Sequence, residues 1–268
     1  MNKESYYNEI YKLYGPVTRA RNCFLYTKKA KRLTDCFQEN GRAILGWDGK
    51  NAFTVFKNLL CRAQVGSFTC EDSCRVGKAL SSLFLSNRRV FYFSSKRDAL
   101  QAGLTISAES TSFYIPWSNF SQSKSCMDTD CIVMCPPLPW TDTIYLLAVK
   151  EELINGKLNI KSTKLPFALE AAIARSIYNL IAALQGREEK DWFIYDTVLT
   201  RYFTRQGPYL VPKIPQEEYD DFILHCLKLG ILFNPDWNEK SIVPFNADKG
   251  VFTCLKNSPF KYGENKKE

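Results

Sequence analysis

The stretch RRVFYFSSKRDALQAGLT, residues 88–105, has the pattern of a buried strand that passes through a short polar turn into a helix. Its β-branched and aromatic residues before the turn predict the strand. Ser94 or Ser95 can cap the helix that follows, and Asp98 suits the positive end of the helix dipole. Small apolar residues after Asp98 predict close packing of the helix on its neighbours.

A strand that ends at a helix N-terminus presents unpaired N–H groups at one point, which makes a ready anion site. Our candidate site for a phosphate is therefore the turn itself, Ser94, Ser95, Lys96 and Arg97. The two cations either attract the phosphate or fill the hollow themselves. The alternative is an ordinary turn whose serine only caps the helix, since capping serines are common.

The composition of the chain predicts a folded protein. Its 268 residues, 45% hydrophobic and 14% aromatic, suffice for one sizeable core or for two lobes. We find no export signal near residue 1 and no apolar stretch that approaches the length of a bilayer span. We therefore expect a soluble, cytoplasmic protein with no membrane partner.

The ten cysteines predict reduced thiols, because they are spread along a chain with many core-forming residues and no export signal. Cys70 and Cys74 are four apart, as are Cys131 and Cys135, and Cys126 lies nearby. Zinc sites prefer tighter knuckles with turn residues between the ligands. We therefore expect buried small hydrophobes and no metal.

The formal net charge of +8 raises the question of an anionic partner. The densest basic run is residues 28–32, with a second cluster in the tail. No nucleic-acid-binding motif accompanies them, so we interpret them as a solvated face and argue against nucleic acid as a partner. The sole histidine, His225, lies within a predicted helix that offers no adjacent nucleophile, and we assign it no catalytic role.

The pattern along the chain predicts alternating helices and strands. Helices are expected at 5–14, from a cap at Asp48 or Asn51 through 61, at 69–86, 144–153, 166–184 and 192–203, and from 215 to a left-handed cap at 230. Strands are expected at 23–26, 33–37, 131–135, 231–233 and 251–255, with one more short strand within 109–130. The helix at 166–184 is apolar almost all round, which predicts a buried central helix.

Two runs carry a resemblance to a known family. CFLYTKKAKRLTD at 23–35, followed by GRAILGW at 41–47, resembles the opening of class III (fold type I) pyridoxal-phosphate-dependent aminotransferases, above all glutamate-1-semialdehyde aminomutase-like members. LPFALEAAIARSIYNLI at 165–181, through RQGPYL and GILF, is similar to the family's C-terminal lobe.

The resemblance implies an α/β chain with a reduced pyridoxal-phosphate-transferase-like fold. It implies a small mixed sheet, a central buried helix and an α+β C-terminal lobe. The domains expected from it are an N-terminal helix and hairpin segment at 1–47, a reduced large, cofactor-type domain at 48–164, and a small domain at 165–268.

The departures from the family concern its chemistry. The family's Asn-Ser-Gly-Thr-Glu-Ala turn holds the cofactor phosphate, and here Lys96 replaces the glycine and Arg97 the threonine, whereas Ser95 matches. The family also uses an Asp against the pyridine nitrogen and a Schiff-base lysine. The corresponding interval, 113–164, holds no Asp-Glu turn and no lysine in a glycine-rich setting. Its lysines, which have the pattern of surface charges, are Lys124, Lys150, Lys157, Lys161 and Lys164.

We therefore predict a degenerate, non-catalytic member of this fold, a pseudoenzyme with no catalytic residues and no bound cofactor. It would act by binding a protein partner or a second copy as a homo-oligomer. The candidate contact is the region of Trp117, Phe120 and Trp140, whose alternative is ordinary core. The alternative function is an enzyme that holds pyridoxal phosphate, or another phosphorylated small molecule, at Ser95.

Overall fold

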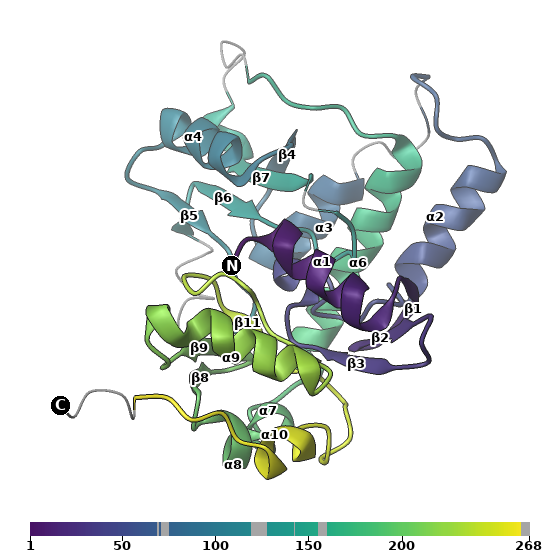
Figure 1. The fold of residues 1–268 in the computed structure, drawn as a ribbon. Helices are drawn as coiled ribbons and strands as arrows, with labels where there is room; N and C mark the ends of the chain where they lie inside the picture. Colours follow the sequence, from purple (N-terminus) through teal and green to yellow (C-terminus); the bar gives the residue numbers. More distant parts are fainter. Residues whose placement is uncertain (69, 71–74, 119–127, 142, 155–159, 264–268) are drawn as a thin grey trace. The chain divides into compact units, whose positions relative to one another are not determined.

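The computed structural model describes residues 1–68, 70, 75–118, 128–141, 143–154 and 160–263. The chain divides into two compact units (Figure 1). Unit 1 combines Met1–Asp48 with Arg187–Glu268, and unit 2 is Gly49–Gly186. The second boundary differs from the one expected at residue 164, because the long apolar helix belongs to unit 2.

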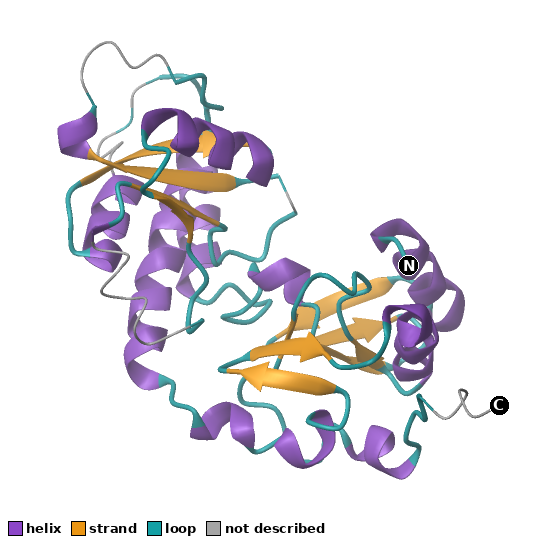
Figure 2. Ribbon diagram, turned by 90° about the vertical axis from the view of Figure 1, so that its left-hand side faces the viewer, coloured by secondary structure: helices purple, strands orange, loops and turns teal. Residues whose placement is uncertain are grey.

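Unit 2 is a sheet with helices on both faces (Figure 2). Its elements are α2 (Asn51–Cys61), α3 (Arg75–Phe84), β4 (Arg88–Phe93), α4 (Lys96–Ile106), β5 (Thr111–Phe113), β6 (Cys131–Met134), β7 (Tyr145–Lys150), the 3-10 turn η2 (Glu151–Leu153) and α6 (Phe167–Gly186). The strand order is β4-β7-β6-β5. β7 is antiparallel to both neighbours and β5 is parallel to β6, so β4, β5 and β6 all run in one direction.

The core of unit 2 forms where alternate strand residues meet α4. Phe93, Val133 and Leu147 pack with Ala99 of α4 on one face of the sheet. On the other face α3 contacts β4, and α6 packs against both α2 and α3. The period-two alternation of a strand separates these two sets of side chains, and both sets are apolar because both faces are covered.

The apolar helix α6 corrects one expectation. This 20-residue helix contains an 18-residue window with a mean hydropathy of 1.4, which reaches the length and composition that a bilayer span needs. Half of that segment is buried, against α2 and α3, as in the core helix of a globular unit. By length and composition alone, core helices and membrane spans are not distinguished.

The segment at 144–153 is a second correction. It forms the central strand β7 and the turn η2, and the helix predicted there is wrong. Residues 144–149 are all buried, since β7 is paired on both edges and covered on both faces. A continuous apolar run of this length does not distinguish a buried strand from a buried helix.

Unit 1 is built from both ends of the chain. Its elements are α1 (Lys3–Tyr14), β1 (Val17–Arg21), β2 (Phe24–Thr27), β3 (Arg32–Asp35), the 3-10 turn η1 (Gln38–Gly41), α7 (Lys190–Phe193), α8 (Asp196–Leu199), β8 (Phe203–Gln206), β9 (Tyr209–Pro212), α9 (Gln216–Lys228), β10 (Ile231–Leu232), β11 (Ser241–Ile242) and α10 (Thr253–Asn257). One sheet has the order β1-β2-β3-β10 and the other β11-β9-β8. The parallel pairing of β10 with β3 joins the N-terminal and C-terminal segments.

An aromatic cluster fills the core of unit 1. The ring of Phe222 on α9 lies 5.0 Å from that of Tyr202, and 5.7 Å from each of those of Phe203 and Phe233. Aromatic pairs at such distances add to the stabilisation from burial. Phe222 is completely buried on α9.

Three expectations for unit 1 are wrong or incomplete. The predicted strand at 251–255 is instead a loop that leads into α10, and the predicted helix at 192–203 is two short helices followed by β8. The edge strand β1 was not predicted. Almost all of this strand is exposed, so its sequence, VTRAR, has no apolar face that would predict a strand.

Candidate functional site

The candidate turn lies at the carboxyl edge of the unit 2 sheet. Because β4, β5 and β6 run in the same direction, Ser94, Tyr114 and Cys135 follow three strand ends at one edge. Ligands of open α/β sheets bind outside the carboxyl ends of parallel strands. The topology therefore brings the predicted turn to the edge where a ligand is expected.

Ser95 is the N-cap of α4. It has extended backbone angles, and its Oγ accepts a hydrogen bond of 3.1 Å from the backbone N–H of Asp98. Ser94 is exposed. The prediction that one of the two serines caps this helix is confirmed, and anion binding at the turn stays a prediction.

The two cations of the turn lie on the surface. The Lys96 Nζ sits 4.5 Å from the centre of the Phe113 ring, at the end of β5, where a cation–π interaction holds it. Arg97 is exposed. The structure thus brings Lys96 and Ser95 to the carboxyl edge, with the ammonium held against an aromatic ring.

Glu170 is a candidate residue that the sequence reasoning missed. It lies in the first turn of α6, half-buried, and accepts a hydrogen bond from the Tyr92 side chain of β4. Burial raises the pKa of Glu170, and the bond from Tyr92 partly offsets this. The signal for it was a single carboxylate in an otherwise apolar first turn, and half-buried carboxyls with raised pKa values are frequent at functional sites.

The lysines of unit 2 lie elsewhere. Among those that the structure describes, none is buried: Lys50, Lys57, Lys78, Lys96, Lys161 and Lys164 are exposed and Lys150 is half-buried. Lys150 pairs with Arg88 across β7 and β4, whereas Tyr145 pairs with Phe93. Five residues of strand, about 16 Å, separate Lys150 from the end that carries the turn. Lys124 and Lys157 fall outside the described residues.

Lys150 belongs to a polar network at the opposite edge. Its Nζ lies 3.2 Å from an Asp130 carboxylate oxygen and donates to the Asp128 carbonyl at 2.9 Å. Burial opposes ionisation of Asp130, but hydrogen bonds from Ser107 and Lys150 outweigh it and lower the pKa. Beside the network is an open cavity of about 350 Å³ lined also by Asn87.

The predicted partner-contact region is largely core where the structure describes it. Trp117 is 7% exposed, and the half-buried Trp140 meets Phe56 edge to face at 5.8 Å. Phe120 lies outside the described residues. Among the exposed apolar side chains of unit 2, three follow one another at and beyond the end of α2, and these are Leu60, Val65 and Phe68 at 44%, 45% and 60% exposure. We call these three residues the α2-end patch.

The cysteines that the structure describes are all free thiols, among them Cys70, Cys131 and Cys135. Cys74 and Cys126 lie outside the described residues. Within the described ranges, no group of three histidine, cysteine or acidic side chains is arranged to hold a metal ion. His225 packs beside Phe260, and its Nε2 lies 2.8 Å from the Ser258 carbonyl oxygen.

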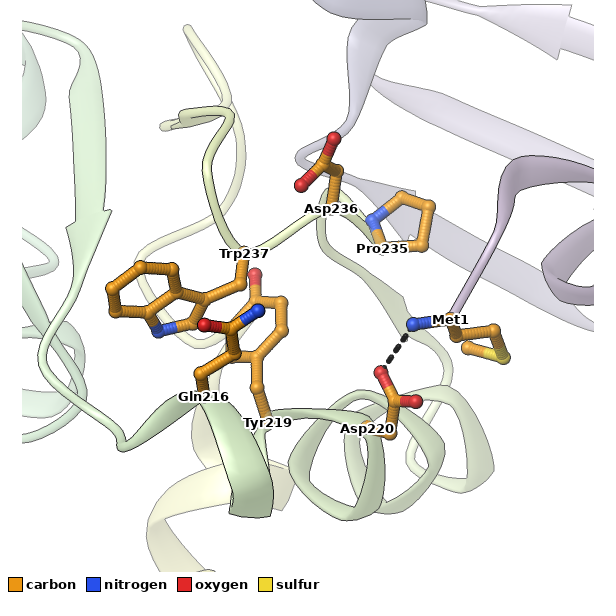
Figure 3. A pocket seen from close by; sticks show the side chains of 7 residues that line it. All are labelled: Met1, Gln216, Tyr219, Asp220, Pro235, Asp236 and Trp237. Atoms are coloured by element: carbon orange, nitrogen blue, oxygen red, sulfur yellow. Dashed lines mark hydrogen bonds and ion pairs between the residues drawn. The ribbon is translucent and has the colours of Figure 1, made fainter.

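Unit 1 contains a small polar pocket that the sequence did not indicate. It has a volume of about 170 Å³ and is lined by side chains that include Gln216, Asp220, Asp236 and Trp237 (Figure 3). The Met1 amine forms an ion pair with Asp220 there. The second carboxylate of the lining, Asp236, accepts hydrogen bonds from the backbone and side chain of Asn238.

Unit 1 also buries a carboxylate, that of Asp35 at the end of β3. It accepts hydrogen bonds of 2.9 Å from the N–H groups of Phe37 and Gln38 and of 2.6 Å from the Trp47 indole. Burial is the main cause that raises the pKa of Asp35, from 3.8 to about 6. The residues that follow, 38–41, all have positive φ. We interpret Asp35 as the clamp that holds this left-handed turn.

The chain was compared with known protein families and sequences. No family model matches the chain. An uncharacterised protein of Treponema pallidum is 23% identical over 287 aligned positions, which cover 90% of this chain and 92% of the relative. An uncharacterised protein of Borreliella burgdorferi is 23% identical, with 91% and 90% covered.

Solved structures define the class of fold. The acetylornithine aminotransferase of Elizabethkingia anophelis aligns with a TM-score of 0.64 at 11% identity, covering 96% of this chain and 98% of the other. The ornithine aminotransferase of Plasmodium yoelii gives 0.66 at 11% identity over 96% and 97%. A glutamate-1-semialdehyde aminomutase of Pseudomonas aeruginosa gives 0.62 at 9% identity over 90% and 85%. The expected α/β, reduced aminotransferase-like fold is confirmed, and identities this low show the fold alone.

The described residues do not fit covalently held pyridoxal phosphate. That cofactor forms its bond with a desolvated lysine amine. No described lysine of unit 2 is buried, and the one half-buried amine is at the wrong end of the sheet. The Ser95 hydroxyl already accepts a bond from its own helix.

Proposed function

We propose that this chain is a non-catalytic protein of the aminotransferase fold that acts by binding another protein chain, in the first place a second copy of itself. The observation that carries the proposal is the placement of the lysines in unit 2. Six described amines are exposed and the seventh, Lys150, is held by Asp130 about 16 Å from the turn. The described part of unit 2 therefore offers no desolvated amine near the turn that could act as a nucleophile.

The absence of lysine chemistry is tested by incubation with pyridoxal phosphate followed by borohydride reduction and peptide mapping. We expect no lysine-linked visible chromophore and no reduced adduct above the level of a surface-lysine control protein. An aminotransferase treated in parallel is the positive control. A stoichiometric adduct at one site, including Lys124 or Lys157, would refute the non-catalytic proposal.

Binding of a second copy is supported by the α2-end patch. Leu60, Val65 and Phe68 lie within nine residues of one another, and exposed apolar side chains that gather on a surface commonly mark a protein contact. Light scattering coupled to gel filtration should give a mass above the 30.8 kDa of one chain. Serine substitutions at Leu60, Val65 and Phe68 should shift it toward the monomer, whereas Leu104→Ser, equally exposed on α4, should not. A monomer both purified and in lysate contradicts this part.

One observation favours a second candidate function, the binding of a phosphorylated small molecule at the turn. Exposed Ser94 and the first-turn N–H groups of α4 lie together at the carboxyl edge of the sheet. Thermal shift with pyridoxal phosphate and with inorganic phosphate tests it. A saturable shift that is lost on Lys96→Glu, and kept on Lys78→Glu, would establish this function.

A further inference from the structure

One surface of unit 1, separate from the sites described above, carries a high density of positive charge. Residues 12–34, which span the end of α1 and the strands β1, β2 and β3, contain no aspartate or glutamate. Their cations are Lys12, Arg19, Arg21, Lys28, Lys29, Lys31 and Arg32. The sequence had singled out only the run at 28–32, because β1 was not recognised as a strand beside it.

The register of the sheet collects three of these cations on one face. Arg19 on β1 is directly opposite Tyr26 on β2, and Tyr26 is directly opposite Arg32 on β3. Arg21 is likewise opposite Phe24 in the adjacent row. Directly opposed residues point to the same face, with Cβ atoms about 5 Å apart. The three strands are neighbours in Figure 1. We call this set the arginine face.

Aromatic rings hold the guanidinium groups of the arginine face. The Arg32 Cζ lies 4.5 Å from the centre of the Phe24 ring, and the Arg19 Cζ lies 5.8 Å from that of Tyr26. Stacking fixes the planar group while its N–H donors stay available at the edge. A preorganised guanidinium loses less conformational entropy when it binds an anion.

These guanidinium groups have no acidic partner. In the part of the chain that the structure describes, none of Arg19, Arg21 and Arg32 lies within ion-pair distance of a carboxylate, and all three are exposed. Lys29 differs, since its ammonium donates to the carbonyl groups of Lys12 and Leu13 at the end of α1. The arginine face is therefore positive and unneutralised.

Protection of a sheet edge does not account for the arrangement. Charged residues on an edge strand such as β1 do prevent pairing with other chains. Arg32, however, is on the inner strand β3, which pairs with β2 at Arg32 and with β10 at Thr34 and Asp35. A cation stacked on an aromatic ring within the sheet serves no edge.

We propose that the arginine face binds single-stranded nucleic acid. Guanidinium forks contact phosphates, and the outer faces of the ring-stacked guanidinium planes can stack on bases. The half-buried Tyr26 lies between two arginines, which is the alternation of phosphate and base contacts that an extended strand needs. A membrane surface is the other outcome that the test separates, since α1 exposes Tyr11 and Leu13 beside these cations.

Fluorescence anisotropy with the full-length chain tests the proposal, using labelled single-stranded RNA and DNA of mixed sequence. Three phosphate contacts predict a slope of about −2 for log affinity against log salt concentration. Replacing Arg19, Arg21 and Arg32 by glutamine should weaken binding at least about tenfold and flatten the slope. Replacing the same three by lysine should leave intermediate affinity, since the charge remains and the fork is lost.

The control replaces Lys228, Lys249 and Lys256, three exposed lysines of the same unit, by glutamine. This variant has the same net charge as the triple arginine variant and should bind like the wild type. Thermal melting of each variant checks its folding, and the single change Arg19→Gln on the exposed edge strand gives a minimal version of the test. The proposal is overturned if the wild type fails to bind at low salt, if the control loses as much affinity as the arginine variant, or if the protein binds anionic vesicles and no oligonucleotide.

Discussion

Asp35 shows what a single residue contributes to unit 1. The side chain is almost completely buried, and three N–H groups of the next dozen residues bond to it. These bonds hold the chain in a turn where Gln38, Glu39 and Asn40 are left-handed, a conformation that costs non-glycine residues free energy. Glu39 is further tied by an ion pair with Lys3.

Asp35 should make stability depend on pH. Burial raises its folded-state pKa from 3.8 to about 6, so between these values the folded state holds the proton more tightly than the unfolded state. Its stabilising contribution is therefore complete below pH 3.8 and is lost as the pH rises through 6, by about 3 kcal/mol in total. In urea titrations from pH 4 to 7, the free energy of unfolding of the wild type should fall relative to that of Asp35→Asn as the pH rises.

The readout for Asp35 is the difference between the two proteins rather than either curve. Asp48→Asn, an exposed position of the same unit, is the matched control for the removal of one carboxylate. If the difference between Asp35→Asn and the wild type stays constant across this range, the carboxyl is not the titrating group.

Arg88 has the corresponding role in unit 2. It is 4% exposed, and its guanidinium donates to the carbonyl groups of Thr129 and Asp130 and to the Ser86 hydroxyl, at 2.7 to 3.1 Å. Arg88→Met should lower the free energy of unfolding by about 2 to 4 kcal/mol, because buried carbonyl groups lose their donor. Arg89→Met, exposed at the next position, should cost much less in the same urea titration. Equal losses would mean that the guanidinium bonds contribute nothing specific.

At the scale of the elements, the strand–turn–helix at 88–105 was predictable and its neighbours were less so. Ser95, Asp98 and the aromatic run specify this unit locally, and the structure has it as β4 and α4. The central strand β7 has no such local signal, since both of its faces are apolar. The edge strand β1 has the opposite problem, because an exposed strand with arginines lacks the apolar alternation that predicts strands.

The same limit applied to the candidate site. The position of Ser95 and Lys96 at the start of a helix was predictable, because a capping serine follows a strand in the sequence. The pairing of Glu170 with Tyr92 was not, since it joins α6 to β4 across almost eighty positions. The arginine face required the register of three strands, and a charge run in the sequence gives no register.

The cap of α4 is tested by two neighbouring serines. Ser95→Ala removes the acceptor of the Asp98 N–H bond and should destabilise unit 2 by about 1 kcal/mol. Ser94→Ala, exposed at the preceding position, should be neutral within the error of a denaturant titration. If Ser94→Ala were destabilising and Ser95→Ala neutral, Ser94 and not Ser95 would be the residue that caps α4.

Close packing of α4 on the sheet is tested at Gly103. A Cβ there would lie 2.8 Å from the Thr111 Cγ2, a branched side chain that is fixed on β5. Gly103→Ala should therefore destabilise by about 1 to 3 kcal/mol, although alanine is the better helix former. Gly186→Ala, at the end of α6 with nothing within 4 Å, should be neutral or slightly stabilising. If the two alanine variants unfold alike, the contact between α4 and β5 is looser than these atoms indicate.

At the scale of the whole molecule, 96% of the chain aligns with the aminotransferase fold, while its sequence identity to those structures is about one residue in ten. The two uncharacterised relatives match it over about nine tenths of their length. A fold does not imply its usual activity, so function has to be argued from sites. Because the chain divides into two units, we expect a substitution in one unit to affect mainly the sites of that unit.

That division makes a final prediction for the intact chain. Unit 2 is one continuous segment with its own core, whereas unit 1 joins two segments through β3 and β10. Local opening follows such cooperative units, so Gly103→Ala should weaken hydrogen-exchange protection in residues 49–186 and leave that of 1–48 and 187–263 unchanged. Asp35→Asn at pH 7 should alter protection in the unit 1 segments only, including β10, which is two hundred residues away in sequence. Mass-spectrometric exchange on the full-length variants measures both, and protection that changes equally in all three segments would show that the chain opens as a single cooperative unit.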